Sequence, residues 1–367
     1  MENYKFINHE KCEFFPCHKT DDKKNFNCLF CYCPLYLMED KCGGNFTYTK
    51  NGVKDCSNCL IPHRRENYDY INNKLYEFTL SQNKERFNKI KAVATDLDHT
   101  LIKDEFAIDD ISIETFKKLK EKGYKTIVAT ARGFYQAYYF TKKLNPDYVI
   151  SDNGALVTKF IDGNKEIIYK VEIPKDIKLD IISSIENFDN LIFMLESRDD
   201  LYVNPCEAEP DFCDKHVEIF KKVQQFDKDL RVNIMRNLKD FPKDKPLTRI
   251  CIFDFLQTDE VQNKLKKIAE KYKGRVNYIQ SFQTVFEFGC SSKGQAMDFL
   301  MDYADIKKEE LMSFGDSLAD IPLLDKSGIP VAVDNAREEL KEHAMYITDS
   351  VFENGTDKFI RENLLNE

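Results

Sequence analysis

Ile90-Lys91-Ala92-Val93-Ala94-Thr95 runs directly into Asp96-Leu97-Asp98-His99-Thr100, so that a short apolar segment ends in two aspartates. The first six residues have the length and the apolar content of a buried β-strand. In open sheets of parallel strands, ligands bind at the carboxyl ends of the strands. The pair Asp96 and Asp98 therefore predicts an acidic site at one edge of a parallel sheet.

Segments with strand-like and helix-like patterns alternate on the C-terminal side of this stretch. Ser112 is expected to cap the first helix at its N-terminus, and Gly123 is expected to end it. In chain order, the sequence predicts a helix over 112–122, a strand over 125–129, a helix over 134–144, a strand over 148–150, a strand over 311–314, a helix over 321–326 and a strand over 329–333. This alternation is typical of an α/β fold in which helices cover the faces of a parallel sheet.

Polar side chains stand at four points where a predicted strand ends or a helix begins. Besides Asp96 and Asp98, they lie in Thr130-Ala131-Arg132, in Ser291-Ser292-Lys293-Gly294 and in Gly315-Asp316-Ser317-Leu318-Ala319-Asp320. Because the carboxyl ends of parallel strands share one edge of the sheet, we expect these groups to form one site.

The chemistry of these side chains suits transfer of a phosphoryl group. The Asp96 carboxylate can attack phosphorus when a cation offsets the repulsion between two anions. Mg²⁺ prefers hard oxygen ligands and is expected between Asp96 and Asp316. Asp98 can protonate the leaving oxygen and then take a proton from the attacking water, and its main-chain carbonyl is a further candidate ligand of the metal.

Three further side chains have supporting roles in this scheme. A fixed hydroxyl on Thr130 and the ammonium group of Lys293 can position the phosphoryl group and offset its negative charge. Asp320 is expected to orient Lys293 or a water molecule on the metal. The predicted acids of the metal site are thus Asp96, Asp98, Asp316 and Asp320.

The order of these motifs resembles the haloacid dehalogenase superfamily across residues 90–363. The chain is most similar to the Cof-type sugar-phosphatase branch, through Ile150-Ser151-Asp152-Asn153-Gly154-Ala155, Ser292-Lys293-Gly294, Gly315-Asp316-x-x-x-Asp320 and Val331-Ala332-Val333-Asp334-Asn335-Ala336. The resemblance implies a Rossmann-like core, with Asp96 as the nucleophile and Asp98 as the acid/base.

The same resemblance implies roles for the remaining motif residues. Thr130 and Lys293 would lie at the phosphate, Asp316 would bind Mg²⁺, and Asp320 would be a supporting acid. Asn335 would lie near the substrate.

Three positions depart from the commonest pattern of that superfamily. His99 and Ala131 stand where glycine is usual, and Ala319 stands where asparagine is usual. None of these changes removes a catalytic group. For His99, packing beneath the loop and contact with the substrate are both open interpretations.

An insertion separates two parts of the predicted core. The segment from Thr130 to Lys293 is far longer than the helix and strand that the core needs, which leaves roughly one hundred residues, the size of a small domain. Strand-like stretches at 191–195, 249–253 and 285–288, with a helical stretch at 258–272, predict an α/β cap domain, placed over 171–283. The catalytic core is then formed by 88–170 and 284–367, and substrate specificity is expected to reside in the cap.

Eight of the twelve cysteines lie in the first sixty residues, which indicates a separate module over 1–75: Cys12, Cys17, Cys28, Cys31, Cys33, Cys42, Cys56 and Cys59. In a chain without an export signal, thiols stay reduced, which favours metal ligands over disulfides. Cys28-x-x-Cys31 and Cys56-x-x-Cys59 have the spacing that places two thiolates on one tetrahedral Zn²⁺, and eight thiolates could fill two such sites. His9, His18 and His63 could replace one or two of the cysteines.

A disulfide-stapled module, buried free cysteines and an iron–sulfur cluster are the alternatives for this segment. It has little helical periodicity and would hardly fold without a metal, so a structural Zn²⁺ is expected. Phe26-Asn27-Cys28-Leu29-Phe30-Cys31-Tyr32-Cys33-Pro34 and Lys54-Asp55-Cys56-Ser57-x-Cys59 resemble the bacterial cysteine-rich small domain family over residues 1–72. The polar residues 76–89 predict a linker with a helical stretch.

The composition argues against several classes of partner. The 54 Lys+Arg and 63 Asp+Glu give a net charge of −9, which disfavours broad binding to nucleic acid or to an anionic membrane surface. Over residues 1–75, 11 Lys+Arg against 10 Asp+Glu leave +1, too weak a charge for a basic nucleic-acid finger. No run approaches the ~18 apolar residues of a membrane helix, and the first residues lack a signal-peptide pattern, which predicts a cytoplasmic protein.

The sequence as a whole predicts a magnesium-dependent phosphatase that acts on a small phosphorylated metabolite, such as a sugar phosphate, through an aspartyl-phosphate. A phosphomutase of the same superfamily is the first alternative. The second is a regulatory or binding protein whose zinc module recognises a protein partner. A dehalogenase is disfavoured because the acid two residues after the nucleophile has no role in that chemistry.

Overall fold

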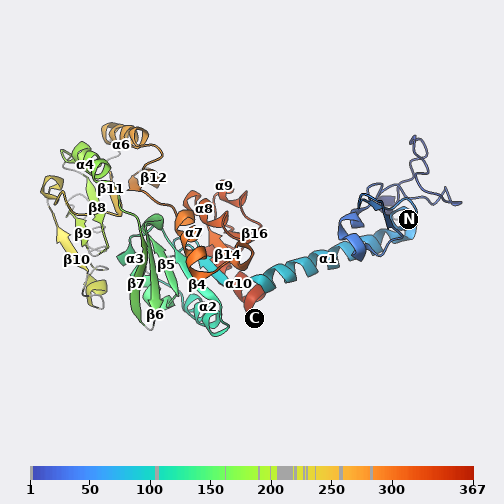
Figure 1. The fold of residues 1–367 in the computed structure, drawn as a ribbon, viewed down its shortest axis with the longest axis horizontal. Coiled ribbons are helices and arrows are strands. Elements are labelled where there is room, and N and C mark those ends of the chain that lie inside the picture. Colours follow the sequence, from blue (N-terminus) through green and yellow to red (C-terminus); the bar gives the residue numbers. More distant parts are fainter. Residues whose placement is uncertain are drawn as a thin grey trace. The chain divides into compact units, whose positions relative to one another are not determined.

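The computed structural model describes residues 3–103, 107–161, 163–188, 191–198, 200–204, 218, 221–225, 228, 230–235, 237–255, 259–281 and 284–367. The chain forms two compact units, Met1–Asn88 and Lys89–Glu367 (Figure 1). Each unit has a hydrophobic core of its own. Within the described ranges, none of the helices combines the length and the apolar character that a membrane crossing requires.

The N-terminal unit consists of short helical turns, one small hairpin and one long helix. Its elements are η1 Asn3–Lys5, η2 Pro34–Cys42, β1 Thr47–Tyr48, β2 Lys54–Asp55, η3 Ile61–His63, η4 Arg65–Asn67 and α1 Tyr68–Lys89. Its core is small and centres on Leu35, Met38, Cys42 and Ile71. A core of this size rarely holds a domain folded without a further constraint such as a metal or disulfides.

Helix α1 covers the segment that the sequence predicts as a linker with a helical stretch. It begins earlier than expected, at Tyr68, and continues without interruption to Lys89. Ile71 near its start is fully buried in the core of the N-terminal unit, with Leu75 and Phe78 packed against that core. The beginning of the helix is therefore part of the cysteine-rich unit.

An eight-stranded sheet forms the centre of the C-terminal unit. The strands follow the order β16-β15-β14-β3-β4-β5-β6-β7, in which the neighbours from β16 to β5 are parallel and the last two pairs are antiparallel. Their bounds are β3 Ala92–Thr95, β4 Lys125–Ala129, β5 Tyr148–Ser151, β6 Leu156–Ile161, β7 Asn164–Lys170, β14 Leu311–Gly315, β15 Ile329–Val333 and β16 Tyr346–Thr348. The strand that leads into Asp96 is a central one, between β14 and β4.

Helices cover both faces of this sheet. On one face, α2 Asp110–Glu121 and α3 Phe134–Leu144 pack against Val128 and Val149. On the other, α7 Lys293–Ala304 and α8 Ile321–Leu324 pack against alanines and isoleucines of β3, β4 and β5. The short helices α9 Glu338–Lys341 and α10 Gly355–Ile360 follow towards the C-terminus. The predicted α/β fold with a largely parallel core sheet is confirmed.

The start of α2 differs from the prediction. The helix begins at Asp110 with Asp109 at the N-cap position, so the expectation that Ser112 caps it is wrong. Ser112 lies inside the first turn and donates its hydroxyl to Asp357 Oδ2 at 2.7 Å. Asp357 lies in α10, far along the chain. A hydrogen bond between such distant segments cannot be predicted from a local sequence pattern.

A second, six-stranded sheet lies between β7 and α7 in the chain. Its order is β10-β9-β8-β11-β13-β12, with bounds β8 Ile192–Glu196, β9 Asp200–Val203, β10 Arg231–Ile234, β11 Arg249–Phe253, β12 Asn277–Ser281 and β13 Val285–Gly289. Helices α4 Lys175–Ile185 and α6 Asp259–Lys271 pack on one face of this sheet. Since β13 belongs to it, the sheet extends past residue 283, where the insertion is predicted to end. Thr258, the expected start of the helix, lies outside the described residues.

The opposite face of the second sheet packs against the core. Met194 and Cys251 from its central strands share one hydrophobic cluster with Phe134, Tyr135 and Tyr138 from α3. Helix α3 therefore lies between the two sheets and contacts both.

The chain leaves the core sheet and returns to it at neighbouring points. Lys170, the last residue of β7, is paired with Leu156 at the start of β6. Two residues before Leu156, Gly154 has φ +94°, and a Cβ placed on it would lie 2.1 Å from the carbonyl oxygen of Ser292, which precedes α7. Both the left-handed backbone and this close approach require glycine at position 154.

Candidate active site

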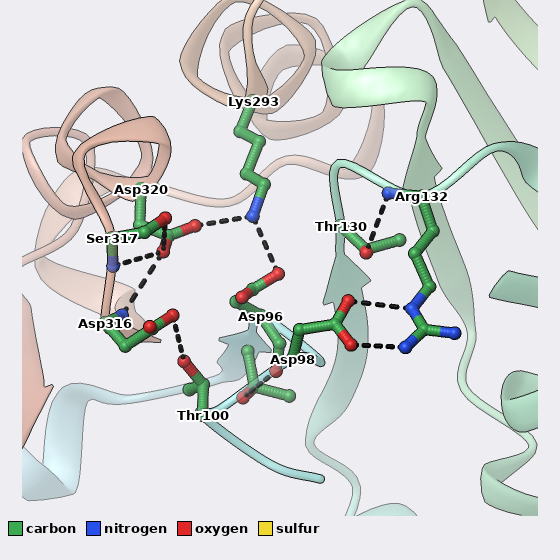
Figure 2. A network of polar contacts seen from close by, with 10 residues as sticks. Asp96, Asp98, Thr100, Thr130, Arg132, Lys293, Asp316, Ser317 and Asp320 are labelled. Carbon is green, nitrogen blue, oxygen red and sulfur yellow. Dashed lines mark hydrogen bonds and ion pairs between the residues drawn. The ribbon is translucent and has the colours of Figure 1, made fainter. Parts of the chain in front are cut away.

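Polar side chains gather at the carboxyl ends of β3, β4 and β14 (Figure 2). Asp96 follows β3, Thr130 follows β4 and Asp316 follows β14, while Lys293 is the first residue of α7. Three adjacent strands, in the order β14-β3-β4, thus bring their end residues to one place. The structure brings together six of the predicted site residues: Asp96, Asp98, Thr130, Lys293, Asp316 and Asp320.

Lys293 links two of the acids. Its Nζ donates to Asp96 Oδ1 at 2.7 Å and also donates to Asp320 Oδ1. The lysine side chain is 1% exposed. Burial alone would lower the pKa of Lys293, but the carboxylates of Asp320 and Asp96 raise it above its ordinary value, so the amine stays charged.

Asp320 organises both the lysine and the loop after β14. Its second oxygen, Oδ2, accepts hydrogen bonds from the backbone N–H groups of Asp316 and Ser317, at 3.2 and 3.0 Å, and from Ser317 Oγ at 3.0 Å. Of the two tasks expected for Asp320, contact with Lys293 is present. With both oxygens engaged and the residue fully buried, Asp320 fixes the position of its neighbours.

Three carboxylates crowd into this site around one ammonium group. Asp96, Asp316 and Asp320 each offer an oxygen, and these oxygens all lie within 4.8 Å of one another. Burial, followed by the charge of Asp320, raises the pKa of Asp96 well above its ordinary value and that of Asp316 to about 6, against the opposing effect of Lys293. Ionisation of all three carboxyl groups would leave more negative charge than Lys293 offsets, and their hard oxygen donors fit Mg²⁺.

Asp98 points away from this group and is held by Arg132. Arg132 Nε donates to Asp98 Oδ2 at 2.7 Å, and Nη2 donates to Oδ1. The guanidinium carbon lies 4.7 Å from the centre of the Phe140 ring. Arg132 belongs to the string Thr130-Ala131-Arg132, but the sequence predicts no role for it. Its position two residues after Thr130 is the sequence feature that could have indicated a place in the site.

The loop from Asp98 to Thr100 is fixed by distant side chains. His99 has φ +56°, a left-handed conformation that explains why glycine is usual there. Asn335 Nδ2 donates to the His99 carbonyl at 2.8 Å, and Asn335 Oδ1 accepts from Val351 N at 2.8 Å. Thr100 Oγ1 donates to Asp316 Oδ1 at 3.1 Å. The His99 side chain is exposed, so the interpretation that it packs beneath the loop is wrong.

A buried ion-pair network lies where the second sheet meets the core. Arg249 contacts Glu196 Oε1 through Nη1 at 2.9 Å and Glu287 Oε2 through Nη2 at 2.8 Å. Glu196 lies directly over Gly133, where an added Cβ would be 1.5 Å from Glu196 Oε2. Burial, opposed by Arg249 and reinforced by Asp152 and Glu287, raises the pKa of Glu196 to about 7. The network therefore touches the residue that follows Arg132.

The N-terminal unit contains a second candidate site, built from sulfur and nitrogen. Cys17 Sγ lies 3.2 Å from His18 Nδ1 and 3.9 Å from His63 Nε2. His63 Nδ1 is hydrogen-bonded to the carbonyl of Asn27 at 3.0 Å, which leaves Nε2 towards the sulfur. Burial lowers the pKa of His63 and keeps the imidazole neutral, as a metal ligand must be. All eight cysteines of the unit are free thiols.

Residues 93–360 match the family of haloacid dehalogenase-like hydrolases, and the chain belongs to this family. Residues 3–86 match the cysteine-rich small domain. Both resemblances predicted from the sequence are confirmed, and so is the prediction that the protein is a hydrolytic enzyme of this superfamily.

Named relatives and solved structures cover most of the C-terminal unit. A 5-amino-6-(5-phospho-D-ribitylamino)uracil phosphatase of Bacillus subtilis (strain 168) is 26% identical over 290 residues, which are 75% of this chain and 98% of the relative. A structure from Thermotoga maritima has a TM-score of 0.61 at 26% identity and covers 74% of this chain and 97% of its own. A sugar phosphatase of HAD subclass IIB has a TM-score of 0.57 at 22% identity, with 74% and 98% covered, and shows the shared fold.

Proposed function

We propose that the protein is a magnesium-dependent phosphatase that hydrolyses the phosphate monoester of a small metabolite, such as a sugar phosphate, through an aspartyl-phosphate on Asp96. The observation that carries the proposal is the contact of Lys293 with both Asp96 and Asp320 at the end of the central strand β3. A carboxylate beside a buried ammonium group suits attack on an anionic phosphoryl group. The phosphatases among the relatives support the same reaction.

Each residue has one task in this reaction. Asp96 attacks phosphorus and forms the new P–O bond, while the bond to the leaving oxygen breaks and Asp98 supplies that oxygen with a proton. Asp98 then accepts a proton from the water that cleaves the aspartyl-phosphate. Lys293 and Thr130 position the phosphoryl oxygens. Mg²⁺, held by Asp96, Asp316, Asp320 and the main-chain carbonyl of Asp98, would offset charge on the phosphoryl group.

The second sheet serves as the cap in this proposal. We propose a catalytic core of residues 88–170 and 290–367 and a cap of residues 171–289, which moves the predicted boundary at residue 283 so that β13 belongs to the cap. The apolar contact of this sheet with α3 brings it towards the strand ends, which supports a role in covering the substrate. Asn335 donates a hydrogen bond to the His99 carbonyl and so fixes the loop from Asp98 to Thr100. We propose that Asn335 lies near the substrate next to this loop.

The cysteine-rich module of residues 1–75 is proposed to hold Zn²⁺ as a structural ion. Thiolates and a neutral imidazole are the ligands that Zn²⁺ prefers, and the small apolar core of this unit supports a need for metal. The proposed ligands are Cys12, Cys17, Cys28, Cys31, Cys33, Cys42, Cys56, Cys59 and His63. A zinc chelator should unfold this unit, seen by circular dichroism and zinc release, and should leave magnesium-dependent activity in place.

Asp96→Asn tests the reaction. Without the nucleophile, phosphate release from a panel of sugar phosphates in the presence of Mg²⁺ should fall by several orders of magnitude. Asp298→Asn makes the same change at a half-exposed position paired with Lys326 and should leave the rate unchanged. Activity of Asp96→Asn near the wild-type rate would contradict the mechanism. Turnover that requires a catalytic amount of sugar bisphosphate would instead identify a phosphomutase.

A further inference from the structure

Two imidazole rings flank the sulfur of Cys17. The distance from Cys17 Sγ is 3.2 Å to His18 Nδ1 and 3.9 Å to His63 Nε2, and all three atoms lie within 4.8 Å of one another. On a tetrahedral Zn²⁺ ion, Zn–S and Zn–N bonds of ordinary length place sulfur and nitrogen about 3.6 Å apart. The two observed distances lie on either side of this value, so the three atoms have the spacing of ligands that share one ion.

Each ring is hydrogen-bonded to a backbone carbonyl through its other nitrogen. His18 Nε2 lies 3.2 Å from the carbonyl oxygen of Cys56, and His63 Nδ1 lies 3.0 Å from that of Asn27. A carbonyl oxygen can only accept a hydrogen bond, so each of these two nitrogens carries a hydrogen. In a neutral imidazole the remaining nitrogen is then unprotonated and presents a lone pair. His18 Nδ1 and His63 Nε2 therefore both face Cys17 Sγ as acceptors.

A thiol on Cys17 cannot satisfy both of these nitrogens. Its single hydrogen can be donated to only one ring, and the lone pair of the other ring then faces the sulfur. A divalent cation bound to the thiolate would engage the sulfur and both lone pairs together. Histidines that bind a metal usually donate their other ring N–H to a carbonyl or a carboxylate, and both rings here have such a carbonyl partner.

The ring of His63 is fixed by residues that are distant in the sequence. It is 3% exposed and stacks on Phe26, with 4.4 Å between the ring centres. Asn27, whose carbonyl orients the ring, is fully buried, and its side-chain oxygen accepts from the backbone N–H groups of Ile7 and Leu29 at 3.0 and 3.1 Å. The residue that orients His63 is thus itself held in place, as a preorganised metal site requires.

We propose that Cys17, His18 and His63 bind one Zn²⁺ ion through Sγ, Nδ1 and Nε2, respectively. The site rests on the zinc binding proposed above for the cysteine-rich module, and it adds His18 to the ligands of that module. Cys17 then belongs to a mixed site of sulfur and nitrogen rather than to a site of thiolates alone. One tetrahedral position remains for a further ligand.

His18→Ala in the full chain tests this site. A chelator is added stepwise to the zinc-loaded wild type and variant, and the released zinc is measured. One equivalent should leave the variant at a chelator concentration lower by about tenfold or more, because loss of even an outer partner weakens metal binding about 10- to 100-fold. His9→Ala removes an exposed histidine outside the site and should release zinc as the wild type does. Identical release curves for His18→Ala and the wild type would overturn the assignment of His18.

The bound nitrogens can also be identified in the unaltered protein, which makes the result independent of how the variant folds. The full chain is labelled with ¹⁵N-histidine and loaded with ¹¹³Cd²⁺. One cadmium resonance should couple directly to His18 Nδ1 and to His63 Nε2, while the other nitrogen of each ring carries a hydrogen. Cadmium resonances that couple to cysteine protons but to no histidine nitrogen would overturn this site and leave the structural metal in place. A chain that binds neither Zn²⁺ nor Cd²⁺ would contradict the proposed structural zinc itself.

Discussion

Arg132 holds both carboxylate oxygens of Asp98, with Nε 2.7 Å from Oδ2 and Nη2 on Oδ1. A guanidinium group can make this planar, two-point contact, whereas an ammonium group cannot. The contact orients the side chain proposed to move protons on and off the leaving oxygen. Arg132 is therefore a positioning residue for Asp98.

Arg132→Lys keeps the charge but loses the two-point contact, and we expect kcat to fall about 10-fold. Asp98→Asn removes the proton donor and should lower kcat by about 10²- to 10⁴-fold, the range of general acid–base catalysis. If Arg132 acts through Asp98, adding Arg132→Lys to Asp98→Asn should cause little further loss. Independent, multiplicative losses in the double variant would show that Arg132 acts elsewhere.

Asp316→Asn should change the magnesium dependence more than the maximal rate. One of three crowded carboxylates loses its charge, so the concentration of Mg²⁺ for half-maximal activity should rise by about tenfold or more, as expected for loss of an anionic ligand. A magnesium titration of phosphate release measures this value. Arg132→Lys is the matched control, because it should lower kcat without moving the titration. An unchanged titration for Asp316→Asn would remove this residue from the metal site.

Gly133→Ala should destabilise the C-terminal unit through a clash with Glu196. The new methyl group would lie 1.5 Å from the Glu196 carboxylate, whose partner Arg249 restricts its movement. We expect a loss of about 1–3 kcal/mol, the usual cost of overpacking. Gly289→Ala is the control, because its nearest neighbour would be the Thr248 carbonyl at 3.7 Å.

Thermal unfolding with and without Glu196→Ala checks the origin of this loss. In the Glu196→Ala background the carboxylate is absent, and Gly133→Ala should have little additional effect. An equal loss in both backgrounds would show that the backbone, rather than Glu196, opposes the methyl group.

Glu196 should make the stability of the C-terminal unit depend on pH. Its pKa is raised in the folded protein to about 7 from an ordinary value of 4.5, so between these values the folded state binds more protons than the unfolded state. Stability should therefore decrease as pH rises from 4.5 to 7, by at most about 1.4 kcal/mol per pH unit from this one group.

Glu196→Gln should remove that contribution to the slope and should raise the melting temperature relative to the wild type above pH 7. Melting temperatures of both proteins over pH 5–8 measure the effect. Parallel curves for the two proteins would mean that Glu196 does not titrate in this range.

The local strings of the sequence predict the central features of the fold and of the site. Asp96, Thr130 and Asp316 each follow a strand directly, so their shared edge could be inferred from the strand pattern. Helix α3 has the predicted bounds, because its apolar spacing is regular over the whole helix.

Contacts between distant segments could not be predicted in this way. Glu196, Arg249 and Glu287 meet because three strands of one sheet lie side by side, and no spacing in the sequence expresses their register. Serine often caps a helix, yet the hydroxyl of Ser112 donates a hydrogen bond to Asp357 instead.

The contact of Gly154 with Ser292 bears on how enzymes of this family evolve. The chain leaves the core after Lys170, which pairs with Leu156, and re-enters it at Ser292, which lies against Gly154. Exit and re-entry therefore both lie against the same short stretch, and an inserted domain has only a short distance to bridge. Domains are tolerated best as insertions at such closely spaced points. Mutation and recombination can therefore exchange or alter the second sheet as one unit. Substrate specificity can change there while Asp96 and Lys293 keep their positions.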